Sequence, residues 1–154
     1  MGGVPAGKGE AYADEQPEVH GGFFGLGAPN DAYAQYFTGR SYLKPLTDPA
    51  CGIFAANVTF EPGCRNHWHI HKAARDGGQL LLCVDGAGWY QEEGKRAQPL
   101  APGSVVTIPA GVKYWHGAAA DSWFSHIAME LPGEGCVTEW CEPVCDAEYD
   151  ALGK

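Results

Sequence analysis

The sequence predicts an all-β domain whose strands close into a sandwich or a small barrel. Short apolar and aromatic runs recur about every 8 to 12 residues with Gly and Pro between them, and the folded part has no long helical period. The chain has 154 residues, of which 45% are apolar and 19% charged, which is enough for one ordinary hydrophobic core. We therefore predict a single folded domain over residues 33–154.

The elements are expected in the following order. Residues 1–32 are rich in Gly, Pro and charge without periodicity, so they predict an N-terminal arm that is partly flexible. Asp146 is suited to cap a short final helix over 147–152. Between the arm and this helix, apolar runs predict strands at 36–46, 53–60, 66–74, 78–86, 87–94, 104–111, 112–119 and 122–131.

Charge and composition exclude several classes of partner. The net charge is −9 and no basic run of five or more residues occurs, so neither nucleic acid nor an anionic membrane is an expected partner. The start of the chain lacks the apolar core of a signal peptide and no stretch approaches about 18 apolar residues, which favours a cytoplasmic protein. The six cysteines are expected to be reduced. The last three, Cys136, Cys141 and Cys145, lack a C-x2-C knuckle and do not predict a zinc site.

The segment NHWHIHKAA, residues 66–74, places His67, His69 and His71 at every second position. Side chains alternate between the two faces of a strand, so a strand here would present all three imidazoles on one face. Burying a polar group without a partner costs about 1 to 3 kcal/mol. Three inward histidines therefore indicate a shared partner such as a metal ion, or a wet cavity.

Two glycine frames surround these histidines and carry a resemblance to a known family. The first contains Gly63, the His69–His71 pair and Gln79, and the second is GSVVTIPAGVKY, with Pro109 and Tyr114 in register. They resemble the two motifs of the cupins over roughly residues 33–149. The runs CRNHWHIH, GWYQEEG, PGSVVTIPAGVKYWHGAA and SHIAME more narrowly resemble small single-domain cupins of the cupin 2 type, which include manganese-dependent bacterial hydroxynitrile lyases and carboxymuconolactone decarboxylase-associated cupins.

The resemblance implies a cupin β-barrel, that is, a jelly roll or double-stranded β-helix, and a metal site. Its ligands would be His69, His71, Gln79 and Tyr114, and its divalent ion Mn, Fe, Ni or Zn. Gln79 replaces the motif's carboxylate, after a longer gap than the motif has, and leaves the site one negative charge poorer. Tyr114 replaces the last histidine of the second motif. Whether Tyr114, His67 or His116 completes the site stays open.

The same resemblance assigns acid/base chemistry to His116 and His126, whose imidazoles suit proton transfer near neutral pH. The expected function is that of a metal-dependent lyase or isomerase of a small organic molecule. An iron-dependent dioxygenase and a non-catalytic ligand-binding cupin altered at Tyr114 are the alternatives, and a structural dimer unit is a third. The family also implies a homodimer or homotetramer. Four tryptophans are expected to pack the barrel and its subunit contacts rather than to bind substrate: Trp68, Trp89, Trp115 and Trp123.

Overall fold

The computed structural model describes residues 20–153. Much of the predicted arm, residues 1–32, lies outside this range. The described part of the arm contains the short 3-10 helix η1 (Gly22–Phe24) and strand β1 (Ala28–Pro29), and β1 pairs with strand β3 (Ser41–Pro45). The chain therefore joins the sheet before residue 33. No helix among the described residues is long and apolar enough to cross a membrane.

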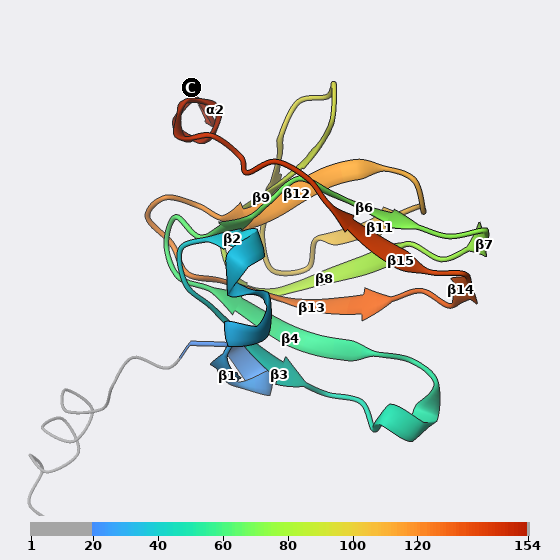
Figure 1. Ribbon diagram of the computed structural model, residues 1–154. Coiled ribbons are helices and arrows are strands. Elements are labelled where there is room, and N and C mark those ends of the chain that lie inside the picture. The colour runs from blue at the N-terminus through green and yellow to red at the C-terminus, as the bar shows by residue number, and fades with distance from the viewer. Residues whose placement is uncertain (1–19, 154) are drawn as a thin grey trace, which may run out of the picture.

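Two curled antiparallel sheets face each other and form an incompletely closed barrel (Figure 1). The prediction of an all-β fold is confirmed. The first sheet has the order β1-β3-β4-β13-β8-β11, and its further strands are β4 (Ala55–Phe60), β13 (Phe124–Glu130), β8 (Gln79–Gly86) and β11 (Val105–Ile108).

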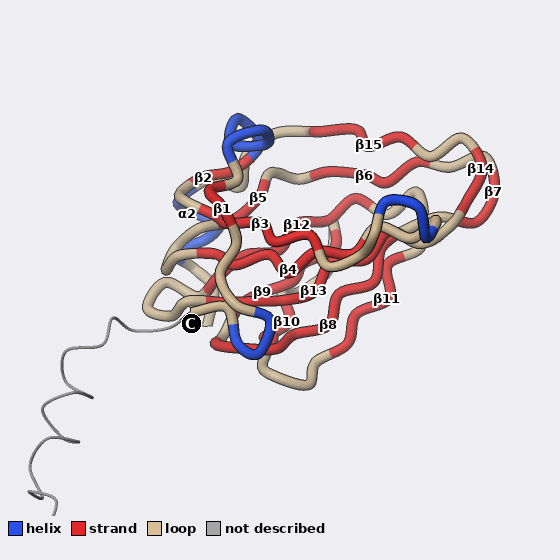
Figure 2. Tube along the Cα trace, turned by 90° about the horizontal axis from the view of Figure 1, so that it is seen from below, coloured by secondary structure: helices blue, strands red, loops and turns tan. Residues whose placement is uncertain are grey.

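The second sheet contains the predicted histidine strand. Its main path is β10-β9-β12-β5-β2, while β6 pairs with both β12 and β15. Figure 2 shows β6 and β15 side by side along one edge, with the β7–β14 pair at the end of that edge. The bounds are β10 (Gln98–Leu100), β9 (Gly88–Glu92), β12 (Lys113–Ala118), β5 (Arg65–Asn66), β2 (Phe37–Thr38), β6 (His69–Lys72), β15 (Val137–Trp140), β7 (Arg75–Asp76) and β14 (Gly133–Glu134).

The main core fills the space between the sheets. Its largest fully buried members include Phe60, Leu81, Ile108 and Phe124, contributed by four different strands. The turn after β8 brings the backbone close to this core at Gly86, where a Cβ atom would lie 1.8 Å from the carbonyl oxygen of Trp123. Only glycine fits there, which explains the glycine at the end of the strand that Gln79 begins.

A second core lies on the outer face of β12, beneath the C-terminal segment. Trp68, Trp115, Val144 and Tyr149 form it. The predicted terminal helix is present as α2 (Asp146–Asp150), and it lies at the opposite end of the molecule from the β7–β14 pair (Figure 1).

Three local predictions need correction. The N-cap of α2 is Cys145 rather than Asp146, because the Asp146 carboxylate instead binds the Arg65 guanidinium at 2.6 Å. The run at 36–46 is not one strand. It comprises the end of the 3-10 helix η2 (Asp31–Tyr36), then β2 and β3, which are separated at Gly39, where φ is +89°. The third 3-10 helix, η3 (Pro49–Cys51), and strand β15 were not predicted.

Candidate functional site

A cavity of about 250 Å³ opens between the two sheets. Histidine and amide side chains, with Glu130 and Thr138, lie on part of its wall, and the rest is apolar and aromatic. A concave apolar space with a few convergent polar groups is the usual form of a small-molecule site. The apolar lining consists of Phe37, Leu43, Phe54, Ala56, Val58, Phe60, Ala128 and Trp140, with Tyr33 at one side.

His69 and His71 lie on alternate positions of β6, and both line the cavity. His69 is only 2% exposed, and burial lowers its pKa to about 3. Its Nδ1 lies 2.8 Å from the His67 carbonyl oxygen, which can only accept a hydrogen bond. His69 therefore carries its proton on Nδ1 and keeps a lone pair on Nε2. Burial also lowers the pKa of His71. Both rings are neutral at neutral pH.

Tyr114 lies behind the cavity wall and is fully buried. Its hydroxyl donates to Gln79 Oε1 and lies 3.0 Å from His71 Nε2. One phenol thus joins two of the predicted metal ligands. Burial raises the Tyr114 pKa well above its ordinary value, and so the phenol stays protonated. The hydroxyl gives its one proton to Gln79 Oε1 and accepts from His71, which favours a supporting role for this side chain.

His116 and His126 form a hydrogen-bonded pair beside the β6 histidines. Asn66 Oδ1 accepts the backbone N–H of His116 at 2.9 Å, which orients the amide so that Nδ2 donates to His116 Nδ1 at 3.1 Å. His116 therefore carries its proton on Nε2 and donates it to His126 Nε2 at 2.9 Å. The remaining proton of His126 lies on Nδ1, which is buried and has no hydrogen-bond partner within residues 20–153.

Burial holds both of these imidazoles neutral. It lowers the His126 pKa to about 3, and burial followed by repulsion from His126 and His69 lowers the His116 pKa well below its ordinary value. The result is an ordered chain of donors, from Asn66 through His116 to His126, that ends in an unsatisfied N–H. A buried donor without a partner costs about 1 to 3 kcal/mol, so its presence beside a cavity favours a ligand that accepts from it.

Strand β15 completes the wall, and sequence reasoning missed it. β15 pairs with β6, so that Thr138 lies opposite His71 and Trp140 lies opposite His69. The Thr138 hydroxyl lies 3.3 Å from His71 Nδ1, and the Trp140 ring lies 4.8 Å from that of His69. Trp140 also stacks on Tyr36 at 4.4 Å. The only sign of this strand in the sequence was that Thr138 and Trp140 lie two positions apart. The residues around them show no alternation of apolar and polar side chains.

The third histidine of the opening pattern lies elsewhere. The strand is interrupted at residues 67 and 68, between β5 and β6, and His67 does not line the cavity. Trp68, Trp89 and Trp115 belong to the second core, and Trp123 stacks on His20 at 3.7 Å. These four tryptophans pack as predicted, whereas Trp140 lies on the cavity wall. All six cysteines are free thiols.

The chemistry of the donor set fits a divalent cation. His69 keeps Nε2 for a metal because Nδ1 is anchored on a carbonyl, an arrangement common among metal-binding histidines. His71 differs, because its Nε2 bonds the Tyr114 hydroxyl, whose one proton goes to Gln79. Nε2 therefore carries a proton here, and an ion would have to displace this bond. The Thr138 hydroxyl, 3.3 Å from Nδ1, could then accept a proton from that nitrogen. Gln79 adds an amide oxygen. In the described part of the chain, no group of three or more His, Cys, Asp or Glu side chains is arranged as a metal site.

Comparisons with known proteins give a consistent result. No family model matches the chain. It is 40% identical over 119 residues to the (R)-mandelonitrile lyase of Granulicella tundricola, an alignment that covers 75% of this chain and 87% of that protein. It is 38% identical to a cupin-like protein of Thermotoga maritima, with a TM-score of 0.73 over 86% of this chain and 98% of that one. A predicted oxalate decarboxylase of the same organism shares the fold, with 14% identity, a TM-score of 0.61, and coverage of 75% of this chain and 98% of that chain.

Proposed function

The chain belongs to the cupin family, and from this premise we propose that it is a lyase that cleaves and forms the carbon–carbon bond of small neutral cyanohydrins. The resemblance to the (R)-mandelonitrile lyase supports this choice of reaction. The aromatic lining of the cavity in the present chain suits an aryl substituent. The observation that carries the proposal is the chain of donors from Asn66 to His126 at the edge of that cavity.

A metal ion is part of this proposal. His69, His71 and Gln79 would hold it, once the ion displaces the Tyr114 hydroxyl from His71 Nε2, while Tyr114 continues to donate to Gln79 Oε1. Mn, Fe, Ni and Zn all accept such nitrogen and oxygen donors. The ion would act as a Lewis acid that polarises the substrate oxygen and makes its hydroxyl more acidic.

The two remaining histidines move the proton. In cleavage, the hydroxyl oxygen loses its proton and the carbon–carbon bond breaks. The electron pair left on oxygen becomes the carbonyl π bond, and cyanide leaves with the electron pair of the carbon–carbon bond. Cyanide accepts the proton on Nδ1 of His126, and the proton that the hydroxyl loses replaces it there. His116 contributes by donating from Nε2 to Nε2 of His126, which keeps the ring in this tautomer. Burial disfavours the charged imidazolium, so neither ring retains a second proton during this transfer.

The test is the cleavage of mandelonitrile by the purified, metal-loaded protein, followed as benzaldehyde release. We expect cleavage well above that of buffer with the same ion, and a loss of about a hundredfold in His126→Ala, because general acid/base catalysis contributes 10² to 10⁴ in rate. The His67→Ala variant is the matched control, since His67 lies off the cavity and offers only its backbone carbonyl to His69. Equal rates in the parent and in His126→Ala would overturn the assignment.

Metal analysis separates this proposal from its alternatives. A His69→Ala, His71→Ala double variant should lose the bound ion that the parent and His67→Ala retain. Equal, negligible metal in all three would leave a non-catalytic ligand-binding cupin as the better description. Bound iron together with substrate-dependent oxygen uptake and no cyanohydrin cleavage would point to a dioxygenase instead.

A further inference from the structure

The cavity adjoins a larger groove of about 610 Å³. Four residues line both spaces: Phe54, His71, Glu130 and Thr138. They come from the segment before β4 and from β6, β13 and β15. Because the groove and the cavity share these walls, a ligand that enters from the groove passes them on its way to the histidines.

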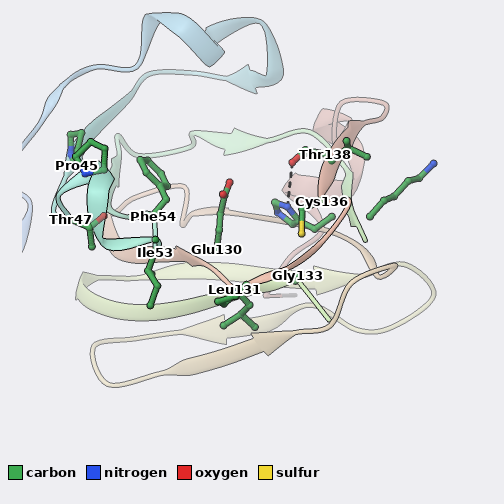
Figure 3. A pocket seen from close by; sticks show the side chains of 16 residues that line it. Pro45, Thr47, Ile53, Phe54, Glu130, Leu131, Gly133, Cys136 and Thr138 are labelled. Carbon is green, nitrogen blue, oxygen red and sulfur yellow. Dashed lines mark hydrogen bonds between the residues drawn. The ribbon is translucent and has the colours of Figure 1, made fainter. Parts of the chain in front are cut away.

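Glu130 has a fixed place in this entrance. It is the last residue of β13, its backbone N–H donates to the Phe54 carbonyl oxygen at 3.0 Å, and its Cα is paired with that of Gln79. Figure 3 shows its side chain standing in the groove between Phe54 and the hydrogen bond that joins Thr138 to His71. Within residues 20–153 the carboxylate has no ion-pair partner.

The surroundings leave this charge uncompensated. Glu130 is the one Asp, Glu, Lys or Arg among the described residues that line the inner cavity. The outer groove adds a single further charged side chain, Lys72, whose ammonium lies 3.0 Å from the Glu139 carboxylate. The entrance therefore carries one net negative charge beside apolar walls, and low-dielectric walls concentrate the field of such a charge.

We propose that Glu130 is a charge filter at the entrance, which offsets part of the charge of the ion proposed for this site and disfavours anions relative to neutral substrates. The part of this inference that concerns substrates rests on the proposed function and makes that function more specific. Mandelonitrile and benzaldehyde are neutral and pass, whereas an aryl carboxylate of the same size is disfavoured. Cyanide is likewise released past Glu130 as neutral hydrogen cyanide, after it has taken its proton from His126.

The test measures access to the cavity without requiring catalysis. Ala128 lines the cavity two positions before Glu130 on the same strand. In the metal-free protein with Ala128→Cys and with Cys136→Ser, which removes the exposed thiol of the groove, the new thiol is labelled with two methanethiosulfonates of similar size, one carrying a trimethylammonium group and the other a sulfonate. Rates are read by peptide mass spectrometry and divided by those of Cys145, which is exposed next to α2, away from the entrance.

We expect the cationic reagent to be favoured by about tenfold with Glu130 in place, since one charge acting over a few ångströms near a protein surface has an effect of this order. The isosteric Glu130→Gln variant should bring the ratio close to one, and Glu130→Lys should invert it. The same comparison with Thr138→Cys as the reporter covers the case in which Ala128→Cys folds poorly.

Two outcomes would overturn the proposal. The first is an unchanged reagent ratio in Glu130→Gln, which would show that the carboxylate does not control access. The second is a loss of bound metal in Glu130→Gln, whatever the reagent ratio, which would make the carboxylate a ligand of the ion. Neither depends on cyanohydrin cleavage, so failure of the filter and failure of the proposed lyase activity are distinguishable.

Discussion

Tyr114 is the residue at which this chain departs most clearly from the motif that it otherwise follows. A histidine in its place would add an imidazole to the site, whereas the tyrosine adds a buried phenol that bonds His71 and Gln79 from behind. The phenol compensates for the loss by fixing two candidate ligands. The change of residue type was visible in the sequence, but its consequence was not, because it depends on which side chains the hydroxyl reaches.

A Tyr114→Phe substitution tests this supporting role. It removes the hydroxyl and leaves Gln79 Oε1 without its donor, so we expect the free energy of unfolding to fall by about 1 to 3 kcal/mol. Urea denaturation of the metal-free protein measures this. Tyr90→Phe is the control, because its hydroxyl bonds Glu92, which also binds Lys95 and keeps a partner. A loss no larger than in the control would contradict the role.

The sequence predicted the polar cavity wall in part. Five of its candidates line the cavity, namely His69, His71, Gln79, His116 and His126, and Tyr114 lies directly behind them. Alternation along a strand predicted that His69 and His71 share a face, and the family resemblance supplied Gln79, His116 and His126. Alternation failed at His67, because the rule holds only in a continuous strand and the strand is interrupted at 67 and 68. Asn66 was missed because nothing local indicates that an amide will orient an imidazole fifty residues away.

At the scale of elements, the long gap between His71 and Gln79 has a structural cause. It contains β7, which pairs with β14 near the other end of the chain. The extra residues thus extend the edge of the barrel as a small ribbon, and Gln79 still begins β8 on the cavity wall. Sequence spacing showed that the motif was stretched. It did not show where the insertion goes, since the partner strand is distant.

The C-terminal segment is a second element with two functions. Its strand β15 contributes Trp140 to the cavity, and its helix α2 covers the outer core. Tyr149 connects this segment to β12, because its hydroxyl donates to the Ala118 carbonyl oxygen at 2.6 Å and the Arg65 guanidinium lies 4.3 Å above its ring.

A Tyr149→Phe substitution keeps the ring and removes this hydrogen bond. We expect a loss of about 1 kcal/mol in unfolding free energy, the usual net value of one buried hydrogen bond, with the second core otherwise intact. Tyr33→Phe is the matched control, because Tyr33 is 48% exposed. Equal unfolding midpoints in chemical denaturation for both variants would argue against docking through this bond.

For the whole molecule, buried neutral histidines link stability to pH. The His126 pKa is lowered to about 3, so between about pH 6.5 and 3 the unfolded chain binds a proton there that the folded protein does not. Stability is therefore fully present above about pH 6.5 and is lost as the pH falls through this window, with a slope of up to about 1.4 kcal/mol per pH unit for each such histidine.

Urea titrations of the metal-free protein between pH 7 and 5 check this slope. In that range few carboxylates titrate, so histidines dominate the change. The His126→Gln variant should give a shallower slope than the parent, because one buried imidazole is removed. The His67→Gln variant should change the slope less, since His67 is less buried and a hydrogen bond with the Cys141 backbone opposes the lowering of the His67 pKa. Parallel curves for the parent and His126→Gln would contradict the assignment of a neutral buried ring.

The overall class of the molecule was predictable, but the way in which it closes was not. Apolar runs and turn residues were enough for an all-β domain, since they are local signals. The pairing of β6 with β15, and the packing of α2 on the outer face of β12, join segments that are far apart and of mixed polarity. Only the long-range structure identifies those partners.

The pairing of distant segments has a kinetic consequence. The wall on which the site is built joins Thr59 to Ser125 across 66 positions and His71 to Thr138 across 67. Chains that must close such long loops before favourable contacts form refold slowly, in about milliseconds to seconds. No local hairpin contains the site, so a partly folded intermediate has no binding pocket, and the recovery of ligand binding should coincide with the last step of refolding.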